Sequence, residues 1–241
     1  LGHRYHLGDL NYSVDGNVSF IKNKLTKLNG GDPVWGAYTV CDEGYGLYTF
    51  WGYKYQGVYK TDDEANKHLW GYAKNGETNP YHAGDAIFAD LDGNGIINDK
   101  DKTDIGNPFP WLTYGLNIGA DCKGIDLQLF FQGVAGNKIF NQMRVRTEGD
   151  GTQSQLSSKM LDVWTSANVE GTIPNPRGNS NNFAASSRFV ESGTYLRLKN
   201  IQLGYTLPKS INSWIGVSKL RVYLQTSNLF TITPYTGYDP E

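Results

Sequence analysis

The chain has 241 residues, of which 22 are basic and 24 are acidic, so its formal net charge is −2. This balance, with no basic stripe along the sequence, argues against nucleic acid as a partner. The two cysteines, Cys41 and Cys122, have neither the spacing of a zinc site nor the number that a disulfide framework needs. The 16 Tyr and 29 Gly are typical of short, twisted strands and their turns.

The first predicted element is a strand that ends near Phe20. Apolar residues occupy the even positions from Tyr12 to Phe20, except at Gly16, and polar residues occupy the odd positions. Such alternation gives a strand one apolar and one polar face. Residues 29–110 follow without a sustained period, which predicts a long loop region that contains short strands.

The clearest hairpin covers residues 112–132, where apolar residues alternate with polar ones on both sides of a tight turn at Lys123-Gly124. A second long segment, residues 135–193, is polar, and residues 154–164 have the spacing of one short helix.

A second hairpin closes the sequence, and its first strand runs from Tyr195 to Leu207. Its apolar parity switches at Lys199-Asn200, which predicts a β-bulge there. Pro208 ends the strand, and residues 208–219 form the connection to the next strand.

The lengths of the connections favour a membrane barrel. Short connections alternate along the chain with the two long segments, 29–110 and 135–193. Outer-membrane barrels have short periplasmic turns and long outer loops, and their strands present an apolar face to lipid and a polar face to the lumen. The alternative is an antiparallel sheet with one solvated face in a soluble protein.

Several ordered motifs resemble those of one family. They are the acidic loop that begins at Asp90, IGNPFP at 105–110, LFFQGVAGN at 129–137, YLRLKNIQLGYTLP at 195–208, and NLF at 228–230. Together they resemble the C-terminal third of the SusC/RagA-type TonB-dependent transporters of Bacteroidetes outer membranes.

The resemblance implies an all-β fold made of antiparallel strands from a large, 22-stranded transmembrane outer-membrane barrel. Residues 1–241 would be a C-terminal part of the barrel domain, with 29–110 and 135–193 as long extracellular loop regions. The plug domain is absent from this sequence, so contact with the TonB complex would go through an N-terminal part that the sequence lacks. We therefore expect the chain to be one part of a larger polypeptide.

The same resemblance implies a function and its partners. The protein would import glycans or peptides across the outer membrane of a Gram-negative bacterium, in contact with outer-membrane lipid. A SusD-like surface lipoprotein would cap its outer mouth. The rival is a secreted, calcium-stabilised β-sandwich that binds glycans or acts as an adhesin, and a third option is a polysaccharide-degrading enzyme.

The acidic loop carries the sharpest local motif. Asp90, Asp92 and Asn94 place side-chain oxygens at alternate positions, Ile96 offers a backbone carbonyl, and Asp101 closes the set. That is the ligand order of an EF-hand-type calcium loop, and oxygen ligands favour Ca²⁺. The alternative is an Asp- and Gly-rich turn that binds nothing.

Aromatic residues crowd the first long segment, and the candidates for substrate or partner contact are Trp35, Tyr45, Trp51, Tyr53 and Trp70. Such rings can stack on sugars or pack against a lid protein, or they can form a small core that holds the segment together. None of the four histidines has a Ser or Cys partner in a recognisable catalytic frame, so we expect no enzymatic activity.

Overall fold

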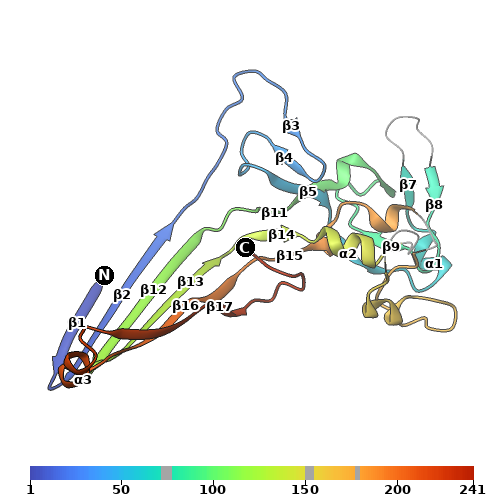
Figure 1. The fold of residues 1–241 in the computed structure, drawn as a ribbon. Coiled ribbons are helices and arrows are strands. Elements are labelled where there is room, and N and C mark those ends of the chain that lie inside the picture. Colours follow the sequence, from blue (N-terminus) through green and yellow to red (C-terminus); the bar gives the residue numbers. More distant parts are fainter. Residues whose placement is uncertain (72–77, 150–154, 177–179) are drawn as a thin grey trace.

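The chain consists of one twisted antiparallel sheet with a separately folded region beyond one end of it (Figure 1). The computed structural model describes residues 1–71, 78–149, 155–176 and 180–241. The sheet has six strands in the order β1 (Gly2–Leu7), β2 (Leu10–Phe20), β12 (Leu112–Cys122), β13 (Ile125–Ala135), β16 (Tyr195–Thr206) and β17 (Arg221–Ile232).

The pairing of the strands gives the sheet two chemically different faces. Ile118 on β12 lies opposite Val14 on β2 and Leu129 on β13, so apolar residues form rows across the strands. The next row, which points to the other face, pairs Gly119 with Ser13 and Gln128. We call these the apolar face and the polar face. The alternation in the sequence predicted both.

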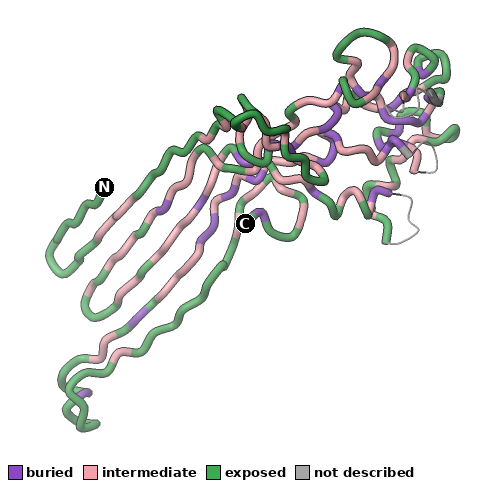
Figure 2. The backbone as a smooth tube through the Cα atoms, turned by 90° about the horizontal axis from the view of Figure 1, so that it is seen from above, coloured by how far each residue is buried: buried purple, intermediate pink, exposed green. Residues whose placement is uncertain are grey.

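No second sheet of the described residues covers the apolar face (Figure 2). Side chains of this face on β16 and β17 are exposed to solvent: Leu203 is 51%, Val222 60% and Leu224 76% exposed. A soluble sandwich would bury this face against a second sheet, so the fold is the single-layer wall of a β-barrel.

The predicted β-bulge is present. Phe130 pairs with Asn200 and Phe131 pairs with Leu198, which leaves Lys199 as the extra residue of β16. Because of this extra residue, Leu198 and Ile201 lie on the same face although their parities differ.

Connection length separates the two ends of the sheet (Figure 1). At one end, Gly8-Asp9, the Lys123-Gly124 turn and residues 207–220 make short connections, and the last contains α3 (Lys209–Trp214). Lys123 and Gly124 both have positive φ, 48° and 86°, as a tight hairpin turn requires. The long connections lie at the opposite end.

The long connections form short elements, which are in chain order β3 (Val34–Trp35), β4 (Thr39–Cys41), β5 (Thr49–Tyr53), β6 (Tyr55–Val58), α1 (Asp62–Ala65), β7 (Leu69–Gly71), β8 (Thr78–Pro80), β9 (Ala86–Phe88), β10 (Ile96–Ile97), η1 (Asp99–Asp101), β11 (Lys102–Gly106), β14 (Lys138–Phe140), α2 (Gln142–Thr147), η2 (Ser158–Asp162), η3 (Ser180–Phe183), η4 (Ser187–Phe189) and β15 (Val190–Ser192). None of the helices in the described ranges is long and apolar enough to cross a bilayer.

The helix expected over 154–164 is wrong in extent. Ser154 lies outside the described residues, and only the 3-10 turn η2 forms in this stretch. The α-helix of this connection is instead α2, whose N-cap residue Asn141 accepts a hydrogen bond from the Arg144 backbone N–H at 3.2 Å.

The two long connections pack into one loop region with a common core. The Tyr53 backbone N–H donates to the Ala185 carbonyl at 2.9 Å, and Asn182 Oδ1 accepts from the Ala86 N–H at 2.8 Å. The core consists of Tyr53, Tyr59, Ala65, Trp70, Tyr81, Ala86, Phe88 and Ile97, all from the first connection, and Ala184 of the second connection packs against it. Burial raises the pKa of Tyr59 to about 12, so its hydroxyl stays protonated beside His68 Nδ1 at 3.0 Å.

Candidate functional site

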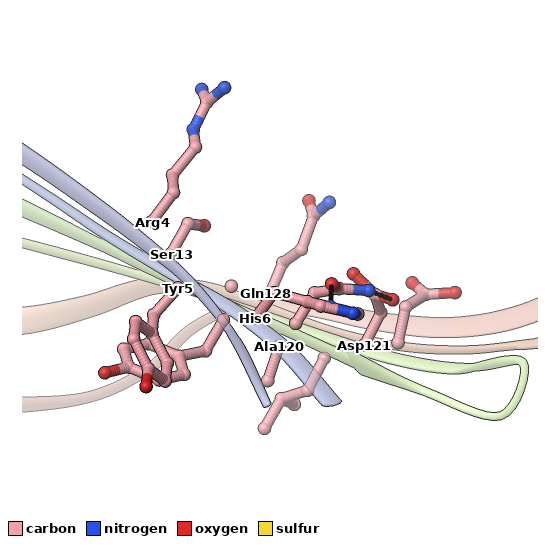
Figure 3. Close-up of a pocket in the computed structure, with 12 residues that line it drawn as sticks. Arg4, Tyr5, His6, Ser13, Ala120, Asp121 and Gln128 are labelled. Carbon is pink, nitrogen blue, oxygen red and sulfur yellow. Dashed lines mark hydrogen bonds between the residues drawn. The ribbon is translucent and has the colours of Figure 1, made fainter. Parts of the chain in front are cut away.

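The polar face carries a row of charged and amide side chains at the end with short connections (Figure 3). His6 Nδ1 and Asn11 Oδ1 are in hydrogen-bond contact, and Asn11 Nδ2 donates to Asp121 Oδ2 at 2.7 Å. On the next strands Arg221 Nε donates to Asp126 Oδ1 at 3.0 Å. A hollow of about 460 Å³ lies along this end and is lined by residues of both faces. Those of the polar face are Arg4, His6, Asn11, Ser13, Gly119, Asp121, Asp126 and Gln128, and those of the apolar face are Tyr5, Tyr12, Ala120 and Leu127.

The two faces are distinct in the close-up. Figure 3 shows Arg4, Ser13 and Gln128 on one side of the strands, with tyrosine rings on the other. Such a polar side offers donors and acceptors to water or to a polar solute, as the interior of a wide barrel does. It offers no paired nucleophile and general base among the residues that line the hollow.

The acidic loop folds around three carboxylates. Ligand oxygens of Asp90, Asp92 and Asp101 all lie within 4.8 Å of one another. Asp90 accepts hydrogen bonds from the backbone N–H groups of Gly95 and Gly93, each at 2.7 Å. These bonds, the one from Gly95 first, hold the pKa of Asp90 below its usual value because they stabilise the carboxylate form.

Asp101 holds the same loop in place through hydrogen bonds to its backbone. Its side chain is fully buried, and it accepts hydrogen bonds from the backbone N–H groups of Leu91 and Asn98, each at 2.8 Å. Asn94 and Ile96, the other two predicted ligands, make hydrogen bonds within the loop. Asn94 Oδ1 accepts from the Ile96 N–H at 2.7 Å, and the Ile96 carbonyl accepts from Asn98 Nδ2 at 3.2 Å.

The five aromatic candidates divide into two groups. Trp35, Tyr45 and Trp51 form one cluster, in which Trp51 meets Tyr45 and Trp35 edge-on at ring separations of 5.3 and 6.2 Å. Trp35 is 61% exposed. Tyr53 and Trp70 are only 3% and 9% exposed and belong to the core of the loop region, which favours the packing interpretation for these two.

A buried ion cluster at the base of the loop region was missed by the sequence analysis. Glu148 has no exposed surface and binds Arg144 Nε at 2.7 Å and Arg188 Nη2 at 2.8 Å. Arg144 also binds Glu191 at 3.0 Å, and Glu191 accepts from the Thr236 N–H at 2.8 Å. Burial lowers the pKa of Arg188, and Glu148 opposes that effect. No local pattern pointed to the cluster, because its ion-paired members are up to 47 positions apart.

Comparison with known proteins adds to this geometry. No family model matches the chain. TonB-dependent receptor P3 of Formosa agariphila is 35% identical over 97% of the chain, and TonB-dependent receptor SusC of Bacteroides thetaiotaomicron is 26% identical over 97%. Among solved structures, the RagAB peptide importer in its "closed-closed" state superposes with a TM-score of 0.76 at 26% identity over 99% of the chain.

Over nearly its whole length, the chain is therefore similar to a segment of SusC/RagA-type TonB-dependent receptors. The recognition made from the ordered motifs is therefore confirmed, and so is the antiparallel barrel fold. The chain spans about a quarter of each relative, namely 23% of receptor P3, 22% of SusC and 26% of the matched RagAB chain.

Proposed function

We propose that the chain forms part of the wall and outer vestibule of a TonB-dependent importer in the outer membrane of a Gram-negative bacterium. The observation that carries this proposal is the two-faced sheet, whose apolar face is uncovered while its polar face presents the row from His6 to Arg221. A wall between lipid and a wet lumen needs this arrangement. The related receptors and the superposition on the RagAB importer support the same function.

Within that function, we infer a structural and binding role and no catalysis. Substrate would be held by polar and aromatic side chains and would move when a plug, driven by the TonB complex, changes position. Oligosaccharides and oligopeptides are the two substrate classes to be compared.

The direct test uses cells that lack the complete receptor and are complemented with it. We expect the receptor in the outer-membrane fraction, and we expect uptake of one labelled class, oligosaccharide or oligopeptide, to depend on it and on TonB. A receptor recovered as a secreted, soluble protein would contradict the proposal. Hydrolysis of a glycan by the purified receptor would contradict the non-catalytic role.

A SusD-like lipoprotein is the partner that we propose for the loop region, and the cluster of Trp35, Tyr45 and Trp51 is its candidate contact. Replacing Trp35 and Trp51 together by alanine should reduce co-purification of the lipoprotein about tenfold, because exposed aromatic anchors carry a large share of binding energy at interfaces. Trp214→Ala, at the opposite end of the strands, is the matched control. Equal recovery from both variants would exclude the cluster as the contact.

Calcium binding at the acidic loop stays a prediction, supported by the close approach of Asp90, Asp92 and Asp101. Millimolar Ca²⁺ should raise the thermal midpoint of the receptor and protect the loop from protease, since a ligand at a hundred times its Kd stabilises by about 2.7 kcal/mol. Asp92→Ala should abolish both effects. Asp99→Asn, which alters only the exposed ion pair with Lys102, should preserve them. A shift that survives in Asp92→Ala would contradict the site.

A further inference from the structure

The short helix α3 has an inverted pattern of burial. It buries a polar residue, Asn212, which is 4% exposed and donates from Nδ2 to the Leu207 carbonyl at 3.0 Å. Its apolar residues point outward: Ile211 is 43% exposed, Trp214 is 86% exposed, and Ile215, directly after the helix, is 40% exposed. The spacing of these three residues places them on one side of the helix. An exposed tryptophan beside two isoleucines needs a partner other than water.

The position of α3 indicates which partner that is. The helix joins β16 to β17 at the end of the sheet away from the loop region (Figure 1). The apolar face continues up to it, because the Tyr205–Val222 pair is followed by Leu207, whose N–H donates to the Leu220 carbonyl at 3.0 Å. The helix therefore begins where the apolar face ends, at the level at which a bilayer changes from acyl chains to headgroups.

The two neighbouring turns differ from this connection. They consist of Gly8-Asp9 and Lys123-Gly124, and neither presents an apolar side chain. The third connection alone among these short ones carries an apolar side, and its helix begins with the exposed cation Lys209. Tryptophan is enriched at membrane interfaces, and lysine there keeps its ammonium group near lipid phosphates.

We propose that α3 is an interfacial anchor, with Ile211, Trp214 and Ile215 inserted between the phospholipids of the leaflet that faces the short connections. The inference rests on the proposed outer-membrane location. It adds a lipid contact outside the strands, which fixes the height of the β16–β17 hairpin in the bilayer. An amphipathic helix of this kind buries its apolar side about 5–10 Å into the boundary between headgroups and acyl chains.

The test uses the complete receptor in phosphatidylcholine vesicles that contain lipid brominated at acyl carbons 6 and 7, which quenches nearby tryptophan. Subtracting the emission of Trp214→Phe from that of the parent protein isolates Trp214, and Trp35→Phe isolates an exposed tryptophan of the loop region as the matched control. The Trp214 signal should fall about twofold, because its ring lies at the depth of the bromines. The Trp35 signal should stay unchanged.

A second variant distinguishes loss of the anchor from loss of the fold. Ile215→Glu should release the anchor, so that the Trp214 emission shifts to the red and its quenching by brominated lipid is lost, while the receptor still floats with the vesicles. If the receptor floats and Trp214 is quenched by aqueous acrylamide but not by brominated lipid, the helix contacts water or another protein and this inference is overturned alone. A receptor that does not float with vesicles contradicts the proposed membrane location as well.

Discussion

Replacing Leu129 by arginine should cost the folded receptor about 2–4 kcal/mol in a bilayer, because a cation on the apolar face near the middle of a barrel strand meets hydrocarbon. Leu129 lies near the middle of β13, in a row with Ile118 and Ile201 on the neighbouring strands. The measurement is urea-induced unfolding of the receptor in vesicles, supported by its abundance in the outer membrane.

The control is the adjacent residue. Gln128 lies on the polar face opposite Gly119 and Gln202, so Gln128→Arg places the same charge in the wet interior. We expect its unfolding free energy to stay within about 0.5 kcal/mol of the parent, as for ordinary surface substitutions. Equal losses of unfolding free energy in Leu129→Arg and Gln128→Arg would mean that the apolar face does not contact lipid while the polar face contacts the lumen.

Replacing Glu148 by alanine should open the base of the loop region, at a cost of about 3–5 kcal/mol, because Arg144 and Arg188 would remain in a buried site without their common carboxylate. The Arg188 side chain is only 4% exposed, so water cannot easily take the place of the carboxylate. Hydrogen exchange should therefore become faster at the amides of α2 and β15 in the complete receptor, while the strands of the sheet keep their protection.

Two further variants sharpen this result. Glu170→Ala removes an exposed carboxylate from the same long connection and should leave exchange unchanged. Glu148→Gln keeps the shape of the side chain but removes its charge and one of its two acceptor oxygens, so its effect should fall between those of the other two. Unchanged exchange in Glu148→Ala would show that packing, and not the ion cluster, holds the base of the loop region.

The parts of the fold that follow from local sequence were predictable. Alternation with period two determined both faces of β12 and β13, and the parity switch located the bulge at Lys199, because each depends only on neighbours along a strand. The acidic loop was predictable for the same reason, since Asp90 and Asp101 are separated by only ten residues.

The parts that depend on distant contacts were not predictable. Whether Trp35 or Trp70 is buried depends on which segments fold over each ring, and composition is the same for both. Glu148 and Arg188 are 40 positions apart within the second long connection and meet only when that connection folds back on itself. The connection over 208–219 gave no helical signal that distinguished it from an ordinary turn, because α3 has only six residues.

The hydrogen bonds between the two long connections have a consequence for engineering. Tyr53 pairs with Ala185, and Ala86 with Asn182, so each connection completes the hydrogen bonding of the other. A chimera that receives only the first connection from a relative would leave these backbone groups without their counterparts. An intact loop region is therefore transferred between such receptors only when both connections are exchanged together, while the strands of the sheet remain those of the host.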